Sequence, residues 1–218
     1  MQIIKKQKLL YNCDLLLCES IELYKSDHFP RSCFLAMTAI EEAGKIITLW
    51  LNPGLFKGPP NYSEMSMAEI GKFFRDHSGK AAAATLTLSK NKEADRRYGI
   101  IPSTNLPWTL GVKELVDPRR WMDLRNSCLY VDVAPGKSEA ISPQEAVLRD
   151  HASYMICMGH EVVADLADAG IEMDHNPDPW FRFKSIVLKR LQEFCKHYAE
   201  SFEWSNLGLF ADSETLPS

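Results

Sequence analysis

Three short segments place charged and hydrogen-bonding side chains on helices that are otherwise apolar. They read AIEEAGK (39–45), FFRDHSGK (73–80) and LRNSCLYVD (124–132). Each segment combines acids, bases or a guanidinium with residues of an apolar helix face. Such groups need partners there, because burying an unpaired charge is costly. The three segments are therefore candidates for the walls of one shared polar site.

The two glutamates of the first segment fall on different helix faces at about 100° per residue. Glu41 lies opposite the apolar arc and precedes Lys45 by four residues, which is the favourable order for a surface ion pair. Glu42 lies at one edge of the arc, so we expect a half-buried carboxylate that needs a donor. Gly44 lies at the other edge, where it would let another backbone come close.

His77 of the second segment lies in the middle of an apolar helix face. A lone inward histidine is usually a satisfied core residue, but here Asp76 and Lys80 accompany it. A contact between His77 and Glu42 would satisfy both groups and raise the proton affinity of the imidazole. These residue types predict proton transfer by His77, with the two charged neighbours in a supporting network.

Arg125 of the third segment lies at the border of an apolar arc, while Asn126 and Tyr130 share another face. An arginine in that position needs an acidic partner or an anion. Two interpretations remain open. An Arg125–Glu42 ion pair would only fix helix packing, whereas a partly free guanidinium would bind phosphate.

The composition indicates a soluble globular chain. Of 218 residues, 45% are hydrophobic and 25% charged, and the net charge is −4. That charge argues against a broad basic face for nonspecific nucleic-acid binding. The six cysteines form no CxxC pair and fall mostly on apolar positions, which indicates a reducing compartment. With no apolar run long enough to span a bilayer, we expect a cytoplasmic protein without a membrane partner.

No metal or cofactor is predicted. His160 and Glu161 lack the second histidine of a zinc helix. The paired Glu-x-x-His repeats of carboxylate-bridged metal bundles are absent. The chain also has no Gly-rich phosphate loop and no GxSxG elbow.

The hydrophobic periodicity is helical almost throughout, which predicts one all-α bundle of about six helices. Ser142, Pro143 and Glu145 form a capping box, and Gly170 is the expected end of the helix that follows. We expect a single domain over 1–205, with an irregular crossing at 98–117 and a loose tail at 206–218. The expected helices span 2–26, 30–51, 66–97, 117–131, 142–169 and 178–201.

In their order and in the helix pattern between them, the three segments resemble the AbiV family of phage abortive-infection proteins. The resemblance covers roughly residues 10–135. AbiV looks like a branch of the HEPN superfamily of small helical domains. The resemblance implies a HEPN-like bundle that dimerises, here through the helix that carries Arg125, and a role in anti-phage defence.

Many HEPN domains are metal-independent ribonucleases with an R-x(4–6)-H motif and a polar residue after the arginine. Arg125 and Asn126 match the start of that motif, but Tyr130, Val131 and Asp132 stand where its histidine would be. Tyrosine, with a reference pKa near 10, is a poor general base at neutral pH. It can still donate a hydrogen bond to a phosphate or to a leaving oxygen.

The leading hypothesis is a toxin-like endoribonuclease in which a ribose 2′-hydroxyl attacks the adjacent phosphate. Arg125 would stabilise the developing charge, Asn126 and Tyr130 would orient the phosphate, and His77 would transfer the proton. The supporting network would consist of Glu41, Glu42, Lys45, Asp76 and Lys80.

Two other hypotheses remain open. The first is a non-catalytic sensor that recognises a phage-encoded protein, in which the polar residues specify helix packing. The second is a plain structural helical protein whose charged residues are incidental.

Overall fold

The computed structural model describes residues 2–50, 76–77, 79–81, 84, 118–133, 140–173 and 176–199. These residues are almost entirely helical, which confirms the predicted all-α fold. The predicted crossing at 98–117 and the tail at 206–218 lie outside the described residues. Among the described helices, none combines the length and the apolar character needed to cross a bilayer.

The first two helices form an antiparallel pair. α1 (Gln2–Lys25) and α2 (Phe29–Trp50) match their predicted bounds, and Asp27 turns the chain between them with a φ of 59°. Two buried serines join the helices. Ser20 Oγ donates to the Ser32 carbonyl oxygen at 2.7 Å, and Ser32 Oγ donates to the Ser20 carbonyl oxygen at 2.8 Å. Small residues here let the backbones come close.

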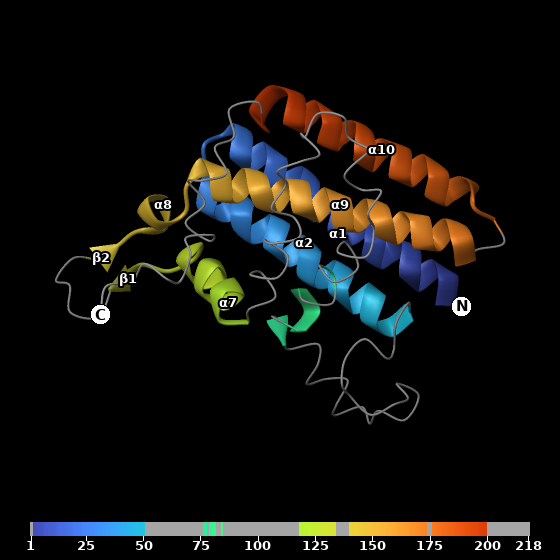
Figure 1. Ribbon diagram of the computed structural model, residues 1–218, viewed down its shortest axis with the longest axis horizontal. Helices are drawn as coiled ribbons and strands as arrows, with labels where there is room; N and C mark the ends of the chain where they lie inside the picture. The colour runs from blue at the N-terminus through green and yellow to red at the C-terminus, as the bar shows by residue number, and fades with distance from the viewer. Residues whose placement is uncertain are drawn as a thin grey trace, which may run out of the picture.

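Two further long helices complete the bundle (Figure 1). α9 (Arg149–Met173) packs on both α1 and α2, and α10 (Asp178–Phe194) packs on α9 and continues into the π-helix η2 (Cys195–Ala199). The core is apolar and includes Leu17, Ile40 and Met155, all fully buried. α2 is therefore covered by two long neighbours.

The predicted helix 142–169 is two helices. The capping box at its start is confirmed, since Ser142 donates to Glu145 Oε2 from its backbone N–H at 2.8 Å and from its hydroxyl at 2.7 Å. α8 (Pro143–Ala146) then stops because Val147, which is buried, adopts an extended backbone. His151 Nδ1 accepts the Leu148 N–H at 3.0 Å and caps the next helix. α9 also runs past Gly170, so that predicted end is wrong.

A short helix lies beside α2 on the side of the candidate site (Figure 1). α7 (Pro118–Ser127) ends four residues earlier than predicted, because the chain turns there and Tyr130 N–H donates to the Asn126 carbonyl at 2.9 Å. The chain then enters a two-residue strand, β1 (Asp132–Val133), which pairs antiparallel with β2 (Ala140–Ile141). This small ladder was not predicted.

Candidate functional site

The buried carboxylate of Glu41 joins three segments of the chain. Glu41 is 2% exposed. Its Oε2 lies 2.6 Å from His77 Nδ1 and 3.9 Å from Lys80 Nζ. Its Oε1 accepts the indole N–H of Trp121 at 3.0 Å and lies 3.4 Å from Arg125 Nε. We call these five residues the Glu41 cluster.

This arrangement corrects the predicted roles of the two glutamates. Glu41 was expected on the surface with Lys45, but Lys45 pairs with Glu42, and both side chains are partly exposed. The expected contacts of Glu42 with His77 and Arg125 are made by Glu41 instead. The helical wheel failed because it assumed a single buried arc. α2 packs on α1 and α9 on one side and on α7 on another.

Asp76 caps the helix that carries His77 and Lys80. Asp76 is not helical, and its Oδ1 accepts the N–H of Gly79 at 3.0 Å. A Cβ at Gly79 would lie 2.6 Å from Asp76 Oδ2, so a side chain there would crowd the cap. The predicted unbroken helix 66–97 is therefore wrong at Asp76, because a new helix begins at His77.

Gly44 makes the close backbone approach that the sequence predicted. A Cβ on Gly44 would lie 1.8 Å from the carbonyl oxygen of Lys80, where no real atom could fit. The backbone of Lys80 thus lies directly against α2, at a position three residues after Glu41. This contact brings His77 and Lys80 within reach of the carboxylate.

The carboxylate fixes the tautomer of His77. With Nδ1 facing Glu41 Oε2, the proton between them sits on the imidazole Nδ1, and Nε2 has no hydrogen-bond partner among the described residues. The side chain of His77 is 35% exposed, whereas that of Glu41 is 3% exposed. A buried acid therefore orients a histidine whose other nitrogen is able to accept a proton.

Within the Glu41 cluster, one carboxylate faces two cations, Lys80 and Arg125. One Glu41 faces Lys80 and Arg125 as well as His77, and a second pair nearby, Glu42 with Lys45, is neutral overall. Burial lowers the pKa of Lys80, and the charge of Glu41 partly opposes that effect. The guanidinium of Arg125 also lies over the ring of Phe34, 5.0 Å from its centroid. Such a cluster attracts an anion.

The remaining two residues of the predicted site are exposed. Asn126 is near the end of α7, and Tyr130 is 62% exposed on the turn beyond it. Neither side chain has a hydrogen-bond partner within the described part of the chain. The structure therefore brings together His77, Lys80, Arg125 and Glu41, and leaves Asn126 and Tyr130 open to solvent at the edge of α7.

Trp121 is the one member of the cluster that was not among the predicted site residues. It is completely buried, and its indole N–H donates to Glu41. A buried indole usually finds an acceptor for its N–H. Because Trp121 lies one turn before Arg125, this requirement could have predicted that its indole N–H takes part in the polar site. In the described residues, no group of three or more His, Cys, Asp or Glu side chains is arranged to hold a metal ion.

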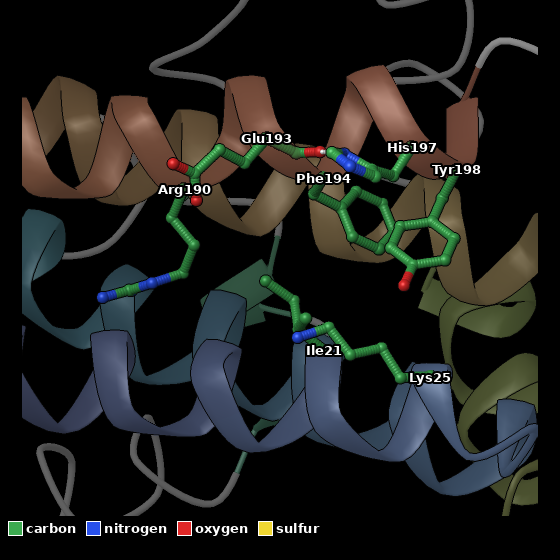
Figure 2. Close-up of a pocket in the computed structure, with 7 residues that line it drawn as sticks. All are labelled: Ile21, Lys25, Arg190, Glu193, Phe194, His197 and Tyr198. Carbon is green, nitrogen blue, oxygen red and sulfur yellow. Dashed lines mark hydrogen bonds between the residues drawn. The ribbon is translucent and has the colours of Figure 1, made fainter.

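A separate pocket of about 330 Å³ lies between α1 and the end of α10. Figure 2 shows Ile21 and Lys25 from α1 facing a wall of residues from α10 and η2. That wall consists of Arg190, Glu193, Phe194, His197 and Tyr198. The pocket shares no residue with the Glu41 cluster.

The sequence profile of one protein family, described as AbiV (HEPN_AbiV), matches residues 5–164 of this chain. The match begins within α1 and ends within α9, and it contains every residue of the Glu41 cluster. No curated protein and no solved structure matches the chain significantly.

Proposed function

The chain belongs to the AbiV family of abortive-infection HEPN proteins, and from this premise we propose that it is a metal-independent endoribonuclease. The observation that carries the proposal is the 2.6 Å contact between His77 Nδ1 and the buried Glu41 Oε2. A histidine oriented by a buried carboxylate is an arrangement suited to general base catalysis. Arg125, whose Nε lies 3.4 Å from Oε1 of the same carboxylate, supplies positive charge beside it.

In the proposed reaction, Nε2 of His77 takes the proton of a ribose 2′-hydroxyl. The 2′-oxygen then attacks the adjacent phosphorus, and the bond to the 5′-oxygen breaks. Arg125 stabilises the charge that develops on the phosphate oxygens. The proton held by His77 passes to the leaving 5′-oxygen, so the products are a 2′,3′-cyclic phosphate and a 5′-hydroxyl.

The other residues of the site have supporting roles in this proposal. Glu41 positions His77 and Arg125, and Lys80 adds positive charge from the buried side. Asp76 holds the helix start that carries His77. The exposed Asn126 and Tyr130 contact the phosphate from the solvent side, and Glu42 with Lys45 forms an outer ion pair. In a homodimer that forms through α7, two such sites would lie near each other.

The test uses both cells and purified protein. Induced wild-type protein should arrest growth and degrade RNA, whereas His77→Ala and Arg125→Ala variants should do neither. Purified protein should cleave an end-labelled RNA in the presence of a chelator and leave 2′,3′-cyclic phosphate ends. An RNA with 2′-deoxyriboses should resist cleavage, because it lacks the nucleophile. If both variants stay as toxic as the wild type, the proposal is wrong.

A second candidate is a non-catalytic sensor of a phage-encoded protein. It is favoured by the contacts around Glu41, since both carboxylate oxygens already have hydrogen-bond partners within the protein. Arg125 also packs on Phe34, and together these contacts are typical of a purely structural network. Tyr130 in place of the usual motif histidine agrees with it. In that case, Arg125→Ala would lower the melting temperature and pure protein would never cut RNA. A pull-down from phage-infected cells with wild-type and Arg125→Ala protein would then identify a specific phage partner.

A further inference from the structure

Two cysteines that the proposed site does not use lie side by side in the core. Cys157 Sγ on α9 is 3.8 Å from Cys195 Sγ at the start of η2. Both residues are buried, and both are free thiols. A disulfide has an S–S distance of about 2 Å, so rotation of the two side chains would have to close the remaining gap.

The two thiols differ chemically. The hydrogen bond between the two sulfurs holds the pKa of Cys195 below its ordinary value. The same hydrogen bond, together with burial, raises the pKa of Cys157, and the nearby charge of Glu161 adds to this. The thiolate is the reactive form of cysteine. The lowered pKa favours Cys195 as the sulfur that attacks first, with Cys157 as the one that resolves.

We infer that Cys157 and Cys195 form an oxidation site, at which a peroxide converts the buried thiol pair into a disulfide between α9 and η2. The Cys195 thiolate attacks one peroxide oxygen, the O–O bond breaks, and one water leaves after protonation, which gives a sulfenic acid. The Cys157 sulfur then attacks the Cys195 sulfur. The S–O bond breaks and a second water leaves, so two thiols are oxidised and one peroxide is reduced.

The bond would fix the segment that forms one wall of the pocket. Phe194 and Tyr198 flank Cys195, and their rings pack edge-on against Tyr24 of α1. Figure 2 shows the same two rings facing the pocket. The disulfide would also close a loop that contains the second half of α9 and all of α10. Closing a loop of this length should raise the melting temperature by about 10 °C.

The experiment treats the purified full-length chain with hydrogen peroxide, blocks remaining thiols by alkylation, and analyses tryptic peptides by mass spectrometry. Cys157 falls in peptide 150–182 and Cys195 in peptide 191–196, so the linked pair has a distinctive mass. We expect this link to exceed every other cysteine pairing by about tenfold in the folded protein, and to lose that preference in urea. A reductant should reverse both the link and the rise in melting temperature.

Variants separate the pair from general oxidation. Cys157→Ser and Cys195→Ser should each abolish the link and the temperature shift, whereas Cys18→Ser, at the least buried cysteine, should change neither. Cys33 and Cys128 also contact each other and are the natural competitors. If the folded protein links those two, or forms only sulfinic acids, while the 157–195 peptide stays absent, the inference is wrong.

Discussion

His77 and Glu41 are 36 positions apart in the sequence, yet His77 Nδ1 lies 2.6 Å from Glu41 Oε2. The carboxylate is almost completely buried, and the imidazole reaches solvent. An interior acid thus controls the orientation and the tautomer of a surface base. The chemistry proposed for the site depends on this pair.

Glu41→Gln removes the charge at the centre of the cluster and keeps the side-chain shape. Lys80 and Arg125 then lose their carboxylate in a buried site, so the free energy of unfolding should fall by about 2–4 kcal/mol. Urea denaturation measures the loss. Glu42→Gln is the matched control, because its partly exposed pair with Lys45 should contribute less than about 1 kcal/mol. Equal losses in the two variants would contradict the assignment of Glu41 as the central carboxylate.

Gly44→Ala tests the backbone contact with Lys80. Alanine favours a helix more than glycine does, yet its Cβ would lie 1.8 Å from the Lys80 carbonyl oxygen. We expect a net destabilisation of about 2 kcal/mol or more, together with loss of growth inhibition, because the 77–81 segment must move away from Glu41. Calorimetry and the growth assay measure the two effects.

Gly159→Ala is the control for that change. Its Cβ would lie 2.5 Å from Cδ2 of Leu17, the end of a flexible side chain that can move. The loss of stability should therefore be smaller, and growth inhibition should persist. A Gly44→Ala protein as stable and as active as wild type would show that the contact has no such role.

His160 should make the fold sensitive to acid. Burial, together with the nearby charge of Arg190, lowers the pKa of this histidine from 6.5 to about 4. The folded state thus prefers the neutral ring. Its contribution to stability is complete above pH 6.5, and it falls by about 3 kcal/mol as the pH drops to 4. Urea denaturation across this pH range should show the decrease.

Replacement of two histidines provides the comparison. His160→Gln should flatten the pH dependence of stability between pH 6.5 and 4. In both histidines, the ring Nδ1 lies 2.8 Å from the backbone carbonyl oxygen four residues earlier. His197 is exposed, however, so His197→Gln should leave the pH dependence of stability unchanged. If the free energy of unfolding of the His160→Gln protein falls with pH as steeply as that of the wild type, His160 is not the origin of the acid sensitivity.

Tyr130→Phe asks whether the exposed phenol takes part in catalysis. The hydroxyl has no partner to lose among the described residues, so the melting temperature should stay unchanged. If Tyr130 donates a hydrogen bond to the phosphate, RNA cleavage should fall by about tenfold. Tyr11→Phe, equally exposed on α1, is the control and should cleave normally. Unchanged cleavage by the Tyr130→Phe protein would remove the residue from the proposed mechanism.

Much of the fold follows from local sequence signals. The bounds of α1 and α2 match the hydrophobic periodicity, and the capping box places the start of α8 at Pro143. The role of Gly44 was also predictable, because only glycine lets two backbones touch in a helix flanked by alanines. These signals depend on a residue and its near neighbours along the chain.

The errors come from contacts between distant segments. A helical wheel cannot show which faces of α2 are buried when neighbours cover the helix on two sides. The predicted roles of Glu41 and Glu42 were therefore interchanged. The end of α7 at Ser127 depends on the turn and on the pairing of β1 with β2, which the periodicity of Cys128 and Val131 does not reveal. The break at Val147 likewise results from burial of that side chain in the bundle.

The meeting of Gly44 with Lys80 also sets a register. α2 contains a single glycine, so its backbone offers only one place where the Lys80 carbonyl can rest without striking a Cβ. A shift of the 77–81 segment by even one helical turn along α2 would place that carbonyl against a side chain. The position of this glycine along α2 therefore fixes where the segment with Lys80 docks, and with it the distance from His77 to Glu41.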